Sequence, residues 1–174
     1  NKHKPDVVVA TETWLNPNDA ELDADDFVIY RRDRQTTIGG GVLIAVHKSI
    51  NSTEIKTCSE NAETVWAKLL LTSQQNITIG ACYHPNVSDK TTIPALKKIL
   101  DTMLNKQHRN IILSGDFNYP GWNWEDMELK PSCQHVGLHK DFKIFLNDNG
   151  LVQEVKKATR DANTLDLIAT NIHE

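Results

Sequence analysis

Residues 111–118 read Ile-Ile-Leu-Ser-Gly-Asp-Phe-Asn, and this stretch decides how the rest of the chain is interpreted. Its three apolar residues predict a buried strand, and Ser114-Gly115 predicts where that strand stops. Asp116 and Asn118 are two positions apart, so both side chains can point the same way at the carboxyl end of the strand. A carboxylate beside a neutral amide is what a metal-assisted phosphate site requires.

A second predicted strand has an acidic residue in the same kind of place. Residues 6–11 form an apolar run that leads into Glu12, Thr13 and Trp14. Further strands are predicted at 27–30, 41–46, 64–69, 77–83, 110–115 and 164–170. Apolar residues at helical spacing over 93–104 and 138–146 predict two helices. Several adjacent strands with only two helices indicate a mixed α/β fold with antiparallel pairing, not a strict βαβ repeat.

Length and composition set the class of protein. The 174 residues suit one domain with a substantial core. Hydrophobic and charged fractions of 39% and 24% are ordinary for a globular protein, and no apolar run approaches the roughly 18 residues of a membrane span. Three widely spaced cysteines argue against a disulfide framework and a zinc knuckle. We therefore expect a reducing, intracellular setting.

The net charge of −4 does not favour a nucleic-acid partner, because such proteins usually carry a basic surface. It does not exclude one, since metal ions offset acidic residues at a catalytic site. The cluster Arg31-Arg32-Asp33-Arg34 offers two interpretations: a contact for phosphates, or a solvated loop after a strand.

Five motifs occur together along nearly the whole chain. They are Thr11-Glu12-Thr13-Trp14-Leu15, Tyr30-Arg31-Arg32-Asp33-Arg34 leading to Gly39-Gly40-Gly41-Val42, Tyr83-His84-Pro85, Gly115-Asp116-Phe117-Asn118 and Leu165-Asp166-Leu167-Ile168. In this order and spacing the chain resembles the endonuclease/exonuclease/phosphatase superfamily, and most closely the endonuclease domain of LINE-like and jockey-like non-LTR retrotransposons. The resemblance implies two packed mixed β-sheets flanked by helices, a four-layer α/β/β/α sandwich. It also implies hydrolysis of phosphodiesters or phosphomonoesters with Mg²⁺ or Mn²⁺.

The resemblance also implies a role for individual residues. Glu12 would be the metal ligand, and Asp116 would hold or activate the attacking water. Asn118 would hydrogen-bond the phosphate, and Tyr83 would stabilise the phosphate from the other side. Asp166 would orient a histidine by accepting its ring N–H.

Each of these residues also has a purely structural explanation. Glu12 could be a loop carboxylate, and Asp116 and Asn118 could each form an Asx-turn. Tyr83 could be a strand-end aromatic residue with a satisfied hydroxyl group. Asp166 lies inside an apolar run, where a buried carboxylate needs a partner, and this favours a functional role.

The family's pattern is not complete in this chain. Its first-strand asparagine would precede residue 1, and its Ser-Asp-His motif is absent from the ending Asn171-Ile172-His173-Glu174. His173 is too close to the preceding strand to be a clear substitute. We therefore expect residues 1–174 to be a single, incomplete domain with little or no turnover by itself.

Other motifs carry weaker signals. Gly39-Gly40-Gly41 lacks the Gly-Lys-Ser/Thr ending of a phosphate-binding loop and predicts a flexible turn. His135 and His139 are predicted to be surface or core residues, although their spacing also suits a metal site. Trp122 and Trp124 could stack on nucleic-acid bases or pack in the core.

The sequence thus favours a Mg²⁺-dependent endonuclease domain of a retroelement, which would nick DNA in the nucleus and leave a 3′-hydroxyl for priming. One alternative keeps the fold and changes the substrate to inositol phosphates or phospholipids. The other alternative is a catalytically degenerate, non-enzymatic remnant. The oligomeric state is open, and no membrane association is expected.

Overall fold

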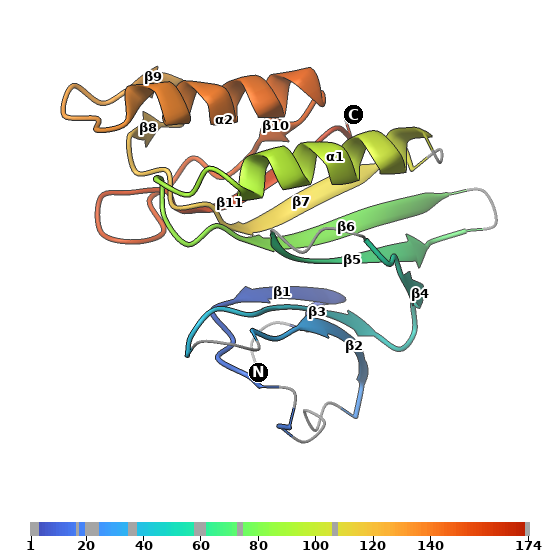
Figure 1. Ribbon diagram of the computed structural model, residues 1–174. Helices are drawn as coiled ribbons and strands as arrows, with labels where there is room; N and C mark the ends of the chain where they lie inside the picture. The colour runs from blue at the N-terminus through green and yellow to red at the C-terminus, as the bar shows by residue number, and fades with distance from the viewer. Residues whose placement is uncertain are drawn as a thin grey trace.

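The computed structural model describes residues 4–16, 18–19, 25–34, 38–57, 62–72, 75–105 and 108–172 (Figure 1). The strands are β1 (Val7–Thr11), β2 (Phe27–Arg32), β3 (Val42–His47), β4 (Asn51–Glu54), β5 (Glu63–Leu70), β6 (Asn76–Tyr83), β7 (Ile111–Asp116), β8 (Trp122–Asn123), β9 (Glu128–Leu129), β10 (Val152–Gln153) and β11 (Asp166–Thr170). The helices are α1 (Thr92–Asn105) and α2 (Val136–Asp148). Every predicted strand and both predicted helices are therefore confirmed.

The strands form two main sheets. The larger sheet has the order β10-β11-β7-β6-β5-β4, the smaller has the order β1-β3-β2, and β8 pairs only with β9. Among the described strands, all pairs are antiparallel except β6 with β7, which are joined through α1. A parallel pair needs such a crossover connection, whereas antiparallel neighbours are joined by short turns. The predicted mixed fold with predominantly antiparallel pairing is confirmed.

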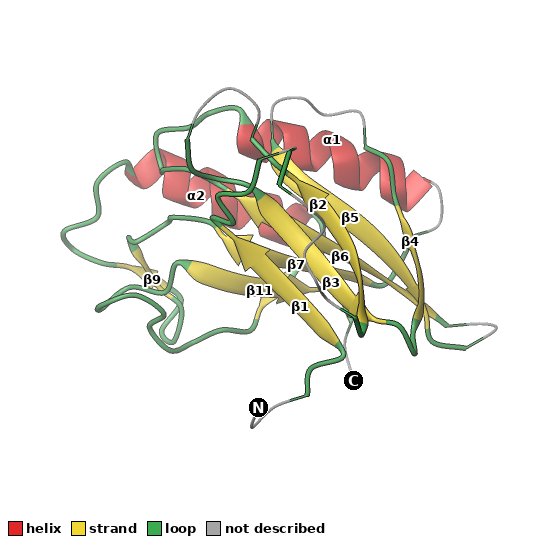
Figure 2. Ribbon diagram, turned by 90° about the horizontal axis from the view of Figure 1, so that it is seen from below, coloured by secondary structure: helices red, strands yellow, loops and turns green. Residues whose placement is uncertain are grey.

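The larger sheet has a hydrophobic core on each of its faces. Alternate residues of β5 show this, because Val65 and Ala67 face the smaller sheet while Trp66 faces the helices. In Figure 2 the smaller sheet lies over part of the larger one, with β1 over β6 and β7 and with β3 over β5. Burial on both faces explains why these strands are nearly continuous apolar runs in the sequence.

The described helices supply one of the two helical layers expected for the sandwich. Both α1 and α2 lie on the same face of the larger sheet (Figure 1), and their apolar stripes contribute Leu96, Leu100, Phe142 and Phe145 to one core. No helix among the described residues covers the outer face of the smaller sheet. The described part of the chain is therefore arranged as helices, larger sheet and smaller sheet, because both amphipathic stripes occur in the segments that connect strands of the larger sheet.

The tryptophan and histidine residues that gave weaker signals in the sequence lie in or beside this core between the helices and the larger sheet. Trp122 and Trp124 are buried, and the Trp122 indole N–H donates to the backbone oxygen of His139 at 3.0 Å. His139 is buried and its Nε2 accepts the Gly121 N–H at 2.9 Å, whereas His135 is exposed. The predicted surface or core role of the two histidines is confirmed. No described helix is both long and apolar enough to cross a membrane.

Candidate active site

Four polar residues lie side by side at one end of the larger sheet. Glu63 pairs with Tyr83, Tyr83 with Asp116, and Asp116 with Asp166, across β5, β6, β7 and β11. Residues that are laterally paired in a sheet point to the same face. Tyr83 belongs to the core between the two sheets, so this row of four side chains faces the smaller sheet.

Glu12 approaches the same row from the smaller sheet. It directly follows β1 and has a positive φ of 54°, which turns the chain after the strand. Its Oε2 accepts the Gly40 N–H at 3.1 Å and the Trp14 indole N–H at 2.7 Å. The Tyr83 hydroxyl also donates to the Glu12 carboxylate. This bond joins the two sheets at the end where the polar row lies.

The surroundings of Glu12 and Tyr83 set their protonation states. Burial acts to raise the pKa of Glu12, but the hydrogen bonds from Tyr83, Gly40 and Trp14, together with the charge of Arg34, lower it below its ordinary value. Burial and then the bond to Glu12 raise the pKa of the Tyr83 phenol well above its usual range. Near neutral pH, Glu12 is therefore an anion and Tyr83 is a hydrogen-bond donor.

Asp116 and Asp166 form a second carboxylate pair beside Tyr83. Asp116 is only 1% exposed; its Oδ2 accepts from Arg160 Nη2 at 3.1 Å and its Oδ1 accepts the Asn118 N–H at 3.1 Å. Burial and then the negative charge of Asp166 raise the pKa of Asp116, and the positive charge of Arg160 together with the two hydrogen bonds only partly offsets this. Two carboxylates with unequal surroundings are a common arrangement for acid–base chemistry.

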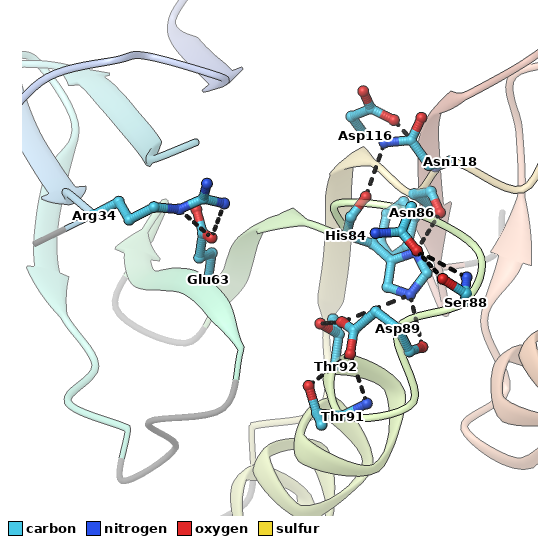
Figure 3. Close-up of polar contacts among 11 residues, drawn as sticks. Arg34, Glu63, His84, Asn86, Ser88, Asp89, Thr91, Thr92, Asp116 and Asn118 are labelled. Atoms are coloured by element: carbon cyan, nitrogen blue, oxygen red, sulfur yellow. Dashed lines mark hydrogen bonds and ion pairs between the residues drawn. The ribbon is translucent and has the colours of Figure 1, made fainter. Parts of the chain in front are cut away.

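Asn118 is fixed to the same end of the sheet. Its φ is 49°, and its side-chain Nδ2 donates to the backbone oxygen of His84 at 2.8 Å (Figure 3). His84 itself is fully buried, and its Nδ1 donates to the backbone oxygen of Phe117 at 2.8 Å. The His84 ring also stacks on Tyr119, with 5.0 Å between the ring centroids. His84 is thus a core residue that supports the segment carrying Asn118.

The structure brings together all five residues that the sequence singled out. Glu12, Tyr83, Asp116 and Asp166 interact through hydrogen bonds or charge, and Asn118 bonds Asp116 through its backbone. The Asx-turn considered for Asp116 is present as well, so the structural and functional interpretations of this residue coexist. Among the weaker candidates, Trp122 and Trp124 are not part of the site, and His173 lies outside the described residues.

Glu63 and Arg160 belong to the site although the sequence patterns did not single them out. Glu63 is the first residue of β5, a strand that also contains Thr64 and Lys68, so a polar residue at this position gives no local signal. Arg160 lies in the turn before β11 and has no such signal, because its pairing with Asp116 joins residues 44 positions apart. Arg34, from the basic cluster considered for phosphate contacts, forms an ion pair with Glu63.

The donor chemistry of the site suits a hard divalent cation. Glu12 supplies an ionised carboxylate, with further carboxylate oxygens on Asp116 and Asp166. Mg²⁺ and Mn²⁺ prefer such oxygen ligands, and Mg²⁺ keeps several waters and needs only one or two carboxylates. Among the described residues, no three carboxylates, imidazoles or thiols are grouped closely enough to form a cage by themselves.

Comparison with protein families agrees with this fold. The family model described as the endonuclease/exonuclease/phosphatase family matches residues 1–132. This match covers most of the chain, and the chain therefore belongs to that family. Members of the family are phosphodiesterases, nucleases or phosphatases. Comparison with the curated proteins found no match.

Several solved structures share the fold. An AP endonuclease, LMAP, from Leishmania major has a TM-score of 0.72 at 12% identity, over 97% of this chain and 70% of its own. The catalytic domain of Xenopus laevis APE2 has a TM-score of 0.63 at 13% identity, over 95% and 74%. ANGEL2, a 2′,3′-cyclic phosphatase, has a TM-score of 0.55 at 16% identity, over 95% and 69%. At these identities the similarity establishes the fold alone.

Proposed function

We propose that this chain is the DNA-nicking endonuclease domain of a retroelement, acting with Mg²⁺ or Mn²⁺ in the nucleus. The observation that carries the proposal is the convergence of Glu12 from the smaller sheet with Tyr83, Asp116 and Asp166 from the larger sheet. The family includes nucleases, and two proteins of similar fold are AP endonucleases or their relatives. The motifs of the sequence add the resemblance to retrotransposon endonucleases.

Glu12 would hold the divalent ion, because its carboxylate is ionised and already fixed by two N–H donors. Such an ion, when bound, supplies positive charge that stabilises the phosphate oxygens and the leaving group. Asp116 would align the attacking water and accept its proton, since a raised pKa makes the carboxylate a stronger base.

The neighbouring side chains suit a phosphate. Tyr83 keeps its proton, and when Glu12 holds the ion, the single O–H of Tyr83 would donate to a phosphate oxygen in place of the Glu12 carboxylate. Asn118 would do the same from the other side, and the side chain of Arg160 is 55% exposed, so its guanidinium can reach an incoming phosphate. Asp166 would orient a histidine, as the resemblance implies.

The test is a plasmid-nicking assay with Mg²⁺, run on the 174-residue chain and on a version extended at both ends in its gene. The extended protein is expected to nick the plasmid, and Asp116→Ala is expected to reduce the rate by roughly 10²–10⁴-fold, the usual contribution of a positioned base. Asp148→Ala is the matched control, because Asp148 forms an exposed ion pair with Lys97 on the helix layer. Undiminished nicking by Asp116→Ala would overturn the assignment of Asp116.

A phosphatase of the same fold is the second candidate, and the similar fold of a 2′,3′-cyclic phosphatase favours it. A panel of inositol phosphates and phospholipids separates the two. Release of phosphate without plasmid nicking would replace the endonuclease by a phosphatase. Absence of both activities in the extended protein would instead support a non-enzymatic remnant.

A further inference from the structure

An ion pair joins the loop after β2 to the start of β5, next to Glu12. Arg34 Nε donates to Glu63 Oε1 at 2.8 Å, and Arg34 Nη2 donates to the same oxygen (Figure 3). The two side chains are 24% and 23% exposed. The Arg34 guanidinium also lies 5.8 Å from the centroid of the Tyr83 ring. This pair therefore packs directly against the candidate active site.

The three consecutive glycines connect this ion pair to Glu12. Gly39, Gly40 and Gly41 have φ values of 91°, 73° and 87°. Residues other than glycine rarely adopt this backbone conformation. The Gly41 N–H donates to Glu63 Oε2 at 2.8 Å, and the adjacent Gly40 N–H donates to Glu12 Oε2 at 3.1 Å. Two successive amides are thus held by carboxylates from different sheets, so the turn is anchored and is not the flexible turn that the sequence predicted.

The glycine turn also packs tightly against the Arg34–Glu63 ion pair. A Cβ atom at Gly40 would lie 2.5 Å from Arg34 Cζ and 2.5 Å from Glu63 Oε2. The turn therefore fits against the ion pair only without a side chain. The Gly40 backbone oxygen also accepts the Trp14 N–H at 3.0 Å, and the Trp14 indole N–H bonds Glu12. A displacement of the turn would move both N–H donors of the Glu12 carboxylate, the Gly40 amide directly and the Trp14 indole through the bond from the Trp14 amide to Gly40.

We propose that Glu63 and Arg34 are positioning residues for Glu12, acting through the Gly39–Gly41 turn. Glu63 holds the turn through the Gly41 N–H and also neutralises Arg34. Without Glu63, the turn loses its anchor, and the positive charge of Arg34 is left beside the Glu12 carboxylate, where it competes with a cation. The inference rests on the proposed function, in which Glu12 binds the divalent ion.

The experiment measures Mn²⁺ affinity of the chain in the absence of DNA, by the loss of the electron paramagnetic resonance signal of free Mn²⁺. Glu63→Gln is expected to weaken Mn²⁺ binding by roughly tenfold, the lower end of the effect of residues that support a metal ligand. Glu12→Gln is expected to abolish the binding. Glu54→Gln is the matched control, because Glu54 forms an exposed ion pair with Lys56 on β4, and its Mn²⁺ affinity should equal that of the wild type.

Arg34→Lys provides a second variant in case Glu63→Gln fails to fold, as judged by thermal unfolding. Lysine keeps the positive charge but lacks the guanidinium group that bonds Glu63 through two nitrogens. We therefore expect the Mn²⁺ affinity to fall several-fold. A positioning role also requires that nicking by the extended Glu63→Gln protein recovers at saturating Mg²⁺, whereas a general structural defect would lower the rate at every Mg²⁺ concentration and would overturn the inference.

The outcomes separate the two proposals. If Glu12→Gln binds Mn²⁺ as the wild type does, the assignment of Glu12 fails and the inference fails with it. If Glu12→Gln loses binding while folded Glu63→Gln and Arg34→Lys match the wild type, the positioning role alone is wrong. Loss of binding in Glu63→Gln as complete as in Glu12→Gln would make Glu63 a ligand, which also overturns the inference.

Discussion

Gly115→Ala tests how closely the fold supports the candidate site, because Gly115 immediately precedes Asp116. Gly115 pairs with Cys82 across the parallel strands and has a φ of 145°. A Cβ atom at this position would lie 1.9 Å from the backbone oxygen of Cys82, whereas real Cβ atoms essentially never come within 3.0 Å of a heavy atom outside their own residue and its two chain neighbours. The obstacle is backbone, so no side-chain rotation can relieve it.

Two contributions set the expected loss of stability. A non-glycine residue in this backbone conformation costs about 1–3 kcal/mol. Separating β6 from β7 by more than 1 Å would also weaken about two ladder hydrogen bonds, each worth about 1 kcal/mol. Together we expect the free energy of unfolding to fall by about 4 kcal/mol, a large part of the roughly 5–15 kcal/mol of a typical domain. Plasmid nicking should be lost as well, because Asp116 moves with Gly115.

The assay is urea unfolding followed by tryptophan fluorescence, with two other Gly→Ala variants as controls. Gly150 has a φ of 64° and open space around its Cα. Gly150→Ala should therefore lower the free energy of unfolding only by the cost of placing alanine in a left-handed conformation, about 1 kcal/mol. Gly137 lies in the first turn of α2, where an added Cβ atom would have no neighbour within 4 Å, so Gly137→Ala should gain up to about 1 kcal/mol. A loss for Gly115→Ala no greater than that for Gly150→Ala would refute the steric argument.

Three further predictions concern charge and packing. Asp166→Asn should lower the pKa of Asp116 and Arg160→Gln should raise it, as measured by carboxyl ¹³C NMR titration. Since the folded-state pKa of Asp116 is raised, stability falls as the pH rises through that pKa, and Arg160→Gln should enlarge this fall. Burial lowers the pKa of His139, so the contribution of His139 to stability is lost as the pH falls through that pKa, and His139→Gln should reduce the loss of stability between pH 8 and pH 5 in urea unfolding. Trp124→Ala should lower the free energy of unfolding by about 3 kcal/mol and leave DNA affinity unchanged in fluorescence anisotropy, because Trp124 is a core residue.

Strong local patterns made most of the fold predictable. The apolar runs at 41–46, 64–69 and 77–83 became β3, β5 and β6, and the two helical stripes became α1 and α2. Short strands such as β4, β8 and β10 were not predicted, since two to four residues are too few to show alternation. The placement of both helices on one face of the larger sheet was not predictable either, because an amphipathic stripe shows that a helix packs and does not show on which sheet it packs.

The candidate site was predictable only where function left a motif in the sequence. Asp116 and Asn118 follow an apolar strand, and Asp166 interrupts one, so all three stand out locally. Glu63 and Arg160 do not, because each acquires its role from a partner about 30 or more positions away. Long-range partners are set by strand register and loop geometry, which no local pattern contains.

The order of apolar, polar and glycine residues along the chain by itself determined the longer strands and the two helices, and the motifs that carry the family resemblance pointed to the five residues considered for phosphate chemistry. Only the tertiary structure decided that β1 delivers Glu12 to Tyr83, that Asp116 lies beside Asp166, and that the three glycines form an anchored turn. The physical reason is distance: backbone preference acts over a few neighbouring residues, whereas hydrogen bonds and charges act between groups that meet only when the two sheets pack.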